Sequence, residues 1–387
     1  MPSLLATTGA MMLVPTLPLY LAEQTTSLTL ISVVLAAAAV GGLVGNLPSG
    51  ALIQRRGERW GFIAGIALSA AGTLALALTT GIWLPFVACL VAGAGQSARL
   101  LARQAYARRA IGLVIRGRLM SLYGGIGRVA LLVGPLAGGF LGESIGFRPT
   151  FAVSAGLLTA ALVAALLAGP GTDGRPSAQR RNASQGVRGV MRSHGRVIGL
   201  AGLGQMGASL VRVGRLTLIP LYGDAIGLDL SDVGIVVAIA GGLDLLLFPA
   251  AGWLMDHFGR LYAIVPSFVI MAAGLASLPL AQSFGTLAAA ALLIGFGNGI
   301  GSGTMLTLST DLAPAENPAE FLGLLRLLAD LGRILGPLAV GIVADQADLG
   351  ASALVLAGVG VATALLFVFA IGEPAPESVS AGRIGSR

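Results

Sequence analysis

The residues of this sequence that can do chemistry are ionisable and polar side chains inside long apolar segments. A charge in such a segment costs about 3 kcal/mol on insertion scales, so each one is a functional candidate. The candidates for a substrate and coupling site are Arg128, Gln205, Arg212, Arg215, Asp244, Arg326, Asp330 and Arg333. Three of them, Arg326, Asp330 and Arg333, follow one another at i, i+4 and i+7, which places them on one stripe of a helix.

A second stripe precedes them in the chain. Gln205, Ser209 and Arg212 share one helical face, and Arg215 lies about one turn further along. Asp244 comes about halfway through the next apolar segment, at a depth close to that of Arg212 if each residue advances ~1.5 Å. The spacing therefore predicts a charged cluster inside the apolar region.

The predicted cluster combines Asp244 and Asp330 with Arg212, Arg215, Arg326 and Arg333. Four guanidinium groups against two carboxylates leave positive charge in excess. Guanidinium groups bind carboxylate or phosphate in a bidentate way, so this excess suits an anionic group on a substrate. Arg128 has no acidic partner inside the membrane in its own half of the chain and is a further substrate candidate.

A structural interpretation of the same residues stays open. The stripe of Arg326, Asp330 and Arg333 can neutralise itself within one helix, and Asp244 can pair with a nearby arginine for the same reason. Arg99 lies near one end of its apolar segment, where we expect its side chain to extend to lipid headgroups.

The segments that carry these residues are long enough to cross a lipid bilayer. Hydrophobic residues make up 55% of the 387-residue chain and charged residues 11%, against about 25% charged in a soluble domain. A membrane span needs ~20 apolar residues. Twelve such spans are predicted, at 3–22, 29–53, 61–80, 82–104, 119–141, 149–168, 197–222, 231–255, 261–281, 285–310, 320–343 and 350–371. The expected fold is an all-α membrane protein of twelve transmembrane helices.

One sequence pattern recurs 202 positions later in the chain. Pro18-Leu19-Tyr20 returns as Pro220-Leu221-Tyr222, and Gly134-Pro135-Leu136-Ala137 returns as Gly336-Pro337-Leu338-Ala339. Duplicated bundles with a substrate site between them are typical of secondary transporters. We therefore predict two pseudo-symmetric six-helix bundles, at 1–168 and 197–371, a linker at 169–196 and a disordered tail at 372–387.

The arginines indicate the orientation of the chain. Three, four and six of them lie in the segments 54–60, 105–118 and 169–196. The alternate connections carry a single arginine, Arg148, beside several acidic residues. Positive charge marks cytoplasmic loops, so both termini and the linker are predicted to be cytoplasmic.

Composition also argues against other classes of function. All 24 basic residues are Arg and are scattered through short loops without interleaved aromatic residues, which argues against a nucleic-acid surface. The sequence offers no metal-ligating or nucleophile–base grouping and no phosphate-binding loop. A membrane enzyme or a non-transporting membrane protein is therefore the remote alternative, and we predict no cofactor apart from a coupling proton.

Two loops carry related motifs. The first contains Gly50, Gln54, Arg55, Gly57 and Arg59, and the second contains Gly252, Asp256, Gly259 and Arg260. In each loop one Gly permits close helix approach and the second Gly a tight turn. The loops resemble the G-x-L-x-D-x-x-G-R motif of the major facilitator superfamily, and the resemblance covers nearly the whole chain. It implies a cytoplasmic latch in which an Asp pairs with a nearby Arg. The first copy has Gln54 in place of that Asp, whereas the second retains Asp256.

A glycine–proline motif extends the resemblance. Its residues are Gly134, Pro135, Gly138 and Gly139, with Gly336 and Pro337 at the repeated position. Proline removes a backbone donor and bends a helix. The motif resembles one that exporters of the superfamily carry in their fifth span, where it is tied to proton-coupled antiport. Gly93 and Gly95 resemble the family's fourth-span motif, but Cys89 stands where that motif has an arginine associated with proton coupling.

The resemblance to twelve-span bacterial exporters implies a monomeric, multi-pass protein of the bacterial inner membrane that moves a small anionic or amphipathic molecule by alternating access. It also implies that the uncharged spans 61–80, 149–168, 261–281 and 350–371 lie on the outside of the bundle. Proton-coupled efflux is the leading hypothesis. Uptake or uniport of an organic anion is the alternative, which the excess of arginine favours and the glycine–proline motif opposes. In an antiporter, Asp244 and Asp330 would bind the proton.

Overall fold

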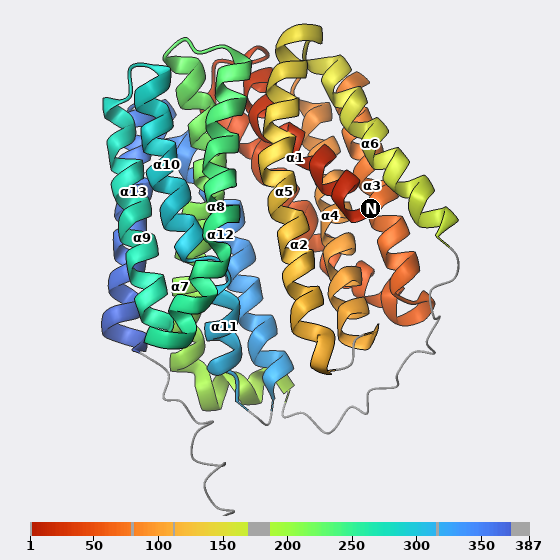
Figure 1. The fold of residues 1–387 in the computed structure, drawn as a ribbon, viewed down its shortest axis with the longest axis vertical. Coiled ribbons are helices and arrows are strands. Elements are labelled where there is room, and N and C mark those ends of the chain that lie inside the picture. The colour runs from red at the N-terminus through yellow and green to blue at the C-terminus, as the bar shows by residue number, and fades with distance from the viewer. Residues whose placement is uncertain (1, 79–80, 111–112, 169–185, 315–316, 373–387) are drawn as a thin grey trace, which may run out of the picture.

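The computed structural model describes residues 2–78, 81–110, 113–168, 186–314 and 317–372, and the regular secondary structure in these ranges is helical (Figure 1). Twelve spans in this part of the chain are long and apolar enough to cross a membrane. The twelve-helix, all-α prediction is confirmed.

The helices form two groups of six spans, which lie on either side of Figure 1. The first half contains α1 (Pro2–Ala22), α2 (Leu28–Arg56), α3 (Glu58–Leu78), α4 (Trp83–Ala110), α5 (Leu113–Ile145) and α6 (Phe147–Leu167). The second half contains α7 (Gly186–Ala225), α8 (Leu230–Phe258), α9 (Arg260–Ser277), α10 (Phe284–Ile300), α11 (Thr304–Asp311), α12 (Pro318–Gln346) and α13 (Leu349–Leu366). A 3₁₀ turn at Leu278–Leu280 extends α9, and a π turn at Phe367–Ile371 extends α13.

Successive connections between spans lie on alternate faces of the molecule. The motif face carries the tight turns at Gly57 and Gly259, whose φ angles of 90° and 104° require glycine, as the motif predicts. The opposite face carries the connections that follow α1, α5, α7 and α12, and it is uppermost in Figure 1.

The second half departs from its predicted boundaries at two places. Helix α7 begins at Gly186, inside the predicted linker 169–196, and has a kink at His194. Val190 anchors this extension because it is buried in one hydrophobic cluster with Phe321 of α12. The polar residues around Val190 hid that contact from a hydrophobicity argument. The rest of the predicted linker, 169–185, and all but the first residue of the predicted tail lie outside the described residues.

The second departure is a break in the tenth span. The sequence predicts one helix over 285–310, but α10 ends at Ile300 and α11 starts at Thr304. Gly303 between them has a φ angle of 84°, in the left-handed region. Two glycines on either side of Ser302 weaken the helix at this point, and the break turns backbone polar groups toward the interior.

The two halves meet along two seams. In the α5–α8 seam, α5 packs on α8, and in the α2–α12 seam, α2 packs on α12. Helices α3, α6, α9 and α13 have their main contacts within their own halves, as expected for the uncharged spans. Residues on α2, α5, α8 and α12 can therefore touch the other half.

Close packing in both seams is confined to the half of the molecule nearer the opposite face. A Cβ added to Gly139 of α5 would lie 2.8 Å from the carbonyl oxygen of Leu230, and one on Gly341 of α12 would collide with Leu28. Further toward the motif face, a Cβ added to Gly50, Gly252 or Gly323 would meet no atom within 4 Å. The halves are thus packed closely on the opposite face. Toward the motif face their ribbons diverge in Figure 1, although the side chain of Arg326 on α12 still reaches Gln104 on α4.

Candidate functional site

A buried charged contact lies near the midpoint of the α5–α8 seam. Arg128 of α5 approaches Asp244 of α8 to 4.0 Å, and their side chains are 14% and 6% exposed. The guanidinium carbon of Arg128 also lies 3.6 Å from the ring centre of Phe248, one helical turn beyond Asp244. Arg128 therefore has an acidic partner in the other half of the protein.

Two arginines of α7 face the same carboxylate. Arg212 and Arg215 both lie within electrostatic range of Asp244, and Arg215 is buried. Arg212 also lies 5.5 Å from the ring centre of Phe268 on α9. The three arginines and Asp244 form what we call the arginine cluster.

The break in the tenth span supplies polar groups to the arginine cluster. Arg212 donates a hydrogen bond of 2.9 Å to the carbonyl oxygen of Gly301, and Arg128 donates one to the hydroxyl of Ser302. The break leaves the carbonyl oxygen of Gly301 outside the hydrogen-bond ladder of α10, and it accepts from Arg212 and from the amide and hydroxyl of Thr304. Sequence reasoning missed Ser302, although a Gly-Ser-Gly stretch inside an apolar span is a signal for an interrupted helix.

The arginine cluster has unused binding capacity. Within the described part of the chain, Nε of Arg212, Nε of Arg215 and Oδ1 of Asp244 are buried without a hydrogen-bond partner. Three guanidinium groups against one carboxylate leave an excess of two positive charges. Buried charge without hydrogen bonds is costly, and an anionic group placed here would supply the missing acceptors.

Gln205 extends the stripe of α7 but binds elsewhere. Its amide donates 3.1 Å to the carbonyl oxygen of Met305 and also bonds the hydroxyl of Ser309. Both partners lie on α11, so Gln205 fixes the short helix that follows the break rather than joining the arginine cluster.

The α2–α12 seam contains a second polar group. Asp330 of α12 pairs with Arg333 at 3.3 Å and accepts a hydrogen bond of 3.3 Å from Asn46 of α2. The amide oxygen of Asn46 accepts in turn from Ser97 of α4. Arg326 donates to Gln104 of α4 at 3.3 Å. Sequence reasoning missed Asn46, because an uncharged amide in span 29–53 does not indicate which residue of another helix it will bind.

The structure divides the single cluster that the spacing predicts. Asp244 lies with Arg212, Arg215 and Arg128, whereas Asp330 lies on the other seam with Arg333. Helical spacing gives the face of a residue but not the neighbouring helix, so it could not separate the two groups.

The loop motifs lie on the motif face. Arg59 of the first copy donates 3.0 Å to the carbonyl oxygen of Leu166 at the end of α6. Gln54 and Arg55 of the same copy are exposed. In the second copy, Arg260 pairs at 2.8 Å with Asp311 of α11 and donates 3.1 Å to the carbonyl oxygen of Met255.

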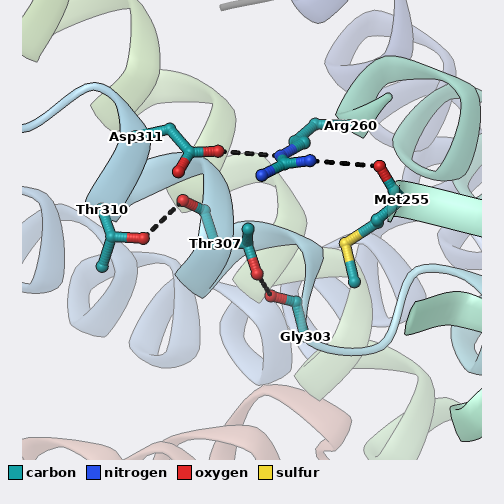
Figure 2. A network of polar contacts seen from close by, with 6 residues as sticks. All are labelled: Met255, Arg260, Gly303, Thr307, Thr310 and Asp311. Atoms are coloured by element: carbon teal, nitrogen blue, oxygen red, sulfur yellow. Dashed lines mark hydrogen bonds and ion pairs between the residues drawn. The ribbon is translucent and has the colours of Figure 1, made fainter. Parts of the chain in front are cut away.

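Figure 2 shows this second network, with Arg260 reaching from the start of α9 to Asp311 at the end of α11. The expectation that Asp256 would pair with the nearby arginine is not met in this conformation, because Asp256 is exposed and Asp311 takes its place. Every contact of Arg260 in the figure is within the second half. Through these contacts the motif loop braces the second half.

The glycine–proline motif serves helix packing on two sides. A Cβ on Gly134 or Gly138 would collide with Met11 or Met12 of α1, and Gly139 faces α8. At the repeated position, a Cβ on Gly336 would lie 2.6 Å from the carbonyl oxygen of Leu210 on α7. Pro135 and Pro337 both lie inside continuous helices, α5 and α12.

Arg99 corrects an expectation for α4. Its side chain does not extend to the headgroups but is buried, with a backbone amide that lies against Gly65 of α3. Gly65 makes room for it, because an added Cβ would lie 2.8 Å from Cγ of Arg99.

Comparison with known proteins places this architecture in a family. The family model described as Major Facilitator Superfamily matches residues 3–337 and, in a second match, residues 201–386. The multidrug resistance protein MdtH of Shigella flexneri is 27% identical over 290 residues, which cover 74% of this chain and 70% of that protein. An uncharacterized MFS-type transporter of Methanocaldococcus jannaschii, MJ1560, is 26% identical over 136 residues, and that match spans only 35% of the length of either chain.

Solved structures agree on the fold. The D-xylose-proton symporter superposes with a TM-score of 0.77 at 17% identity and covers 96% of this chain and 98% of its own. The nucleoside transporter NupG superposes with a TM-score of 0.75 at 14% identity and covers 94% of this chain and 97% of its own.

Proposed function

The chain belongs to the Major Facilitator Superfamily, and we propose that it is a secondary active exporter that moves a small anionic or amphipathic organic molecule in exchange for protons. The observation that carries this proposal is the arginine cluster, a buried site with excess positive charge where the two halves part. The similarity to MdtH, named a multidrug resistance protein, supports the direction of transport.

In the proposed site, Arg128, Arg212 and Arg215 bind the anionic group of the substrate. Arg128 comes from one half and the other two from the second half, so a bound anion links both halves. Such a ligand favours conformations in which the halves approach around it, which is the requirement for alternating access. Phe248 offers an apolar surface beside the anion for the rest of an amphipathic molecule.

Asp244 is the proposed proton-binding residue. Its carboxylate lies 4.0 Å from Arg128 and within electrostatic range of Arg212 and Arg215. In the proposed exchange, the substrate anion and the proton occupy the arginine cluster in turn. The anion leaves on one side of the membrane, and Asp244 then takes up a proton from that side and releases it on the other side before the next anion binds. Asp330 is the second proposed coupling residue, since it joins the halves through Asn46.

The remaining assignments complete the proposal. We assign the motif face, both termini and the linker to the cytoplasm of a bacterial cell, on the basis of the arginine distribution. The protein would then work as a monomer in the inner membrane, with residues 1–168 and 197–371 as the two moving bundles. The conformation described above, closed on the opposite face, would be the one that accepts substrate from the cytoplasm.

Proteoliposomes with a pH dye in their lumen test this function. A pH gradient is imposed and a panel of anionic and cationic amphiphiles is added in turn. We expect anionic members to drive proton movement through the wild type and not through an Asp244→Asn/Asp330→Asn double variant. Wild-type coupling in the double variant would reject the assignment of both carboxylates.

Uptake of an organic anion is the second candidate function, favoured by the same excess of arginine. The two candidates differ in the direction of net flux under an inward proton gradient. Accumulation of the anion on the side of the motif face would establish uptake, and its depletion there would establish export.

A further inference from the structure

Asp345 joins the two halves at the opposite face. It lies in the last turn of α12, and its three hydrogen bonds all go to the start of α2 in the other half. Oδ1 accepts from the amide of Leu28 at 2.8 Å, and Oδ2 accepts from the amide of Thr29 at 2.9 Å and the hydroxyl of Ser27 at 2.8 Å. The carboxylate therefore caps the N-terminus of α2, where unpaired amides and the helix dipole favour an anion.

Glu143 makes the corresponding contact in the other seam. It lies in the last turn of α5, and Oε2 accepts at 2.9 Å from the amide of Ser231 at the start of α8. The residue that precedes α8, Asp229, makes no capping hydrogen bond with its own side chain. The start of α8 is thus capped from the other half of the protein.

The two carboxylates occupy equivalent positions in the repeat. Glu143 and Asp345 are separated by 202 residues, the offset that relates the two halves. Each lies at the end of one helix and binds the beginning of a helix in the other half. Four residues before each carboxylate lies a glycine in close backbone contact across the same seam, Gly139 in one and Gly341 in the other.

We propose that Glu143 and Asp345 form a paired latch that holds the opposite face closed and so sets the balance between the two transport conformations. When the halves separate on that face, both carboxylates lose partners that their own halves do not replace. Asp345 has three donors and Glu143 has one, so Asp345 is the stronger of the two. The inference rests on the alternation of access in the proposed function, but it requires neither a particular substrate nor proton coupling.

A control residue lies close by on the same face. Asp348 also caps a helix, with its Oδ1 accepting from the amide of Ala351 at 2.6 Å, but that helix is α13 in its own half. Replacing Asp348 removes a helix cap without touching a seam. Any effect that Asp345→Asn has and Asp348→Asn lacks therefore belongs to the contact between halves.

Cysteine accessibility in the purified, substrate-free protein tests the latch. The single cysteine, Cys89, is replaced by alanine to give a cysteine-free background. One reporter, Ser32→Cys, lies fully buried in the α2–α12 seam below the latch. The other, Gly323→Cys, lies on the same face of α12 as Asp330, in open space toward the motif face.

We expect Asp345→Asn to raise the labelling rate of Ser32→Cys by a water-soluble maleimide about tenfold and to lower that of Gly323→Cys, because charge-assisted hydrogen bonds hold the closed state. Glu143→Gln should act in the same direction by about threefold, and Asp348→Asn should change neither rate. Unchanged rates in Asp345→Asn would overturn the latch. A rise of both rates would also overturn it, because that pattern reports loss of packing and not a reciprocal change of access. Either result leaves the transport assay, and hence the proposed function, to be decided separately.

Discussion

The α5–α8 and α2–α12 seams share one framework, made of capping carboxylates and closely packed glycines, but they differ in the charges at their midpoints. Both begin at the opposite face with a carboxylate that caps a helix of the other half, and both continue through glycines in close contact. At their midpoints, Arg128 on α5 and Asp330 on α12 occupy equivalent positions, 202 residues apart, and carry opposite charges. Duplication has thus kept the parts that bring the halves together while the buried polar groups diverged.

The difference in charge separates two roles. Arg128 belongs to a group of three arginines and one carboxylate, with donors left unused. Asp330 has an arginine one turn away and an amide from the other half, so its charge is balanced locally. An excess of buried charge needs a ligand, whereas a balanced group can act as a structural contact. The α5–α8 seam is therefore the better substrate site and the α2–α12 seam the better hinge.

The largest expected effect comes from disrupting the close glycine packing of a seam. In Gly341→Ala, the new methyl group would collide with the backbone of Leu28 and with Ser32 across the α2–α12 seam. Overpacking of this kind costs about 1–3 kcal/mol, so we expect the transport rate in proteoliposomes to fall at least about tenfold. Gly358→Ala is the matched control, because a Cβ there meets nothing within 4 Å. Equal rates in the two variants would show that the seam does not close tightly during transport.

The two midpoint carboxylates give the next largest effect. In Asp244→Asn, we expect substrate-driven proton movement to fall about fivefold, since Asp330 remains as the second proposed coupling residue. The affinity for an anionic substrate should rise by a similar factor, since a competing charge has been removed. Asp330→Asn should reduce transport while leaving that affinity unchanged, because Asp330 lies outside the arginine cluster. Dye fluorescence and equilibrium binding measure the two quantities. The comparison of the seams fails if the two variants behave alike.

The sequence predicts the helices and turns that the two seams share better than the buried charges in which the seams differ. The offset between Pro18 and Pro220, the apolar runs and the turn glycines are local or periodic features, and the structure bears out the helices and turns that they predict. The grouping of charges depends on which helix lies opposite, and spacing along one helix does not contain that information. Arg128 therefore gained a partner, Asp244, that could not be foreseen.

The break at Gly303 and the capping contacts of Asp345 were missed for a related reason. A Gly-Ser-Gly stretch is compatible with a continuous span until Arg128 and Arg212 hold the freed polar groups. Asp345 reads as an ordinary loop acid until α2 is brought beside it. Both features depend on contacts between segments more than 80 residues apart in the sequence.

A conservative substitution that keeps the positive charge tests the specific geometry of the arginine cluster. Arg128→Lys keeps the positive charge but loses the planar group that stacks on Phe248 and reaches Ser302. We expect affinity for an anionic substrate to weaken about threefold, since a lysine replaces neither the fork nor the stacking. Arg333→Lys on the other seam, where the side chain is 40% exposed, should weaken it less than about twofold. Substrate-binding isotherms of the two variants give the ratio.

The smallest effect is expected at the motif face, in the second copy of the loop motif. Asp311→Asn removes the carboxylate that pairs with Arg260 at 2.8 Å, but both side chains are about 30% exposed. Exposed pairs of this kind contribute about 0.2–1 kcal/mol, so thermal unfolding in detergent should shift only slightly downward. Asp256→Asn should not shift it at all, because Asp256 is exposed and Arg260 does not pair with it here. A larger loss in Asp256→Asn than in Asp311→Asn would mean that the motif acts mainly in the other conformation, with the halves joined at the motif face. The halves would then have a further contact at the motif face, which breaks in the conformation where Glu143 and Asp345 hold the opposite face closed.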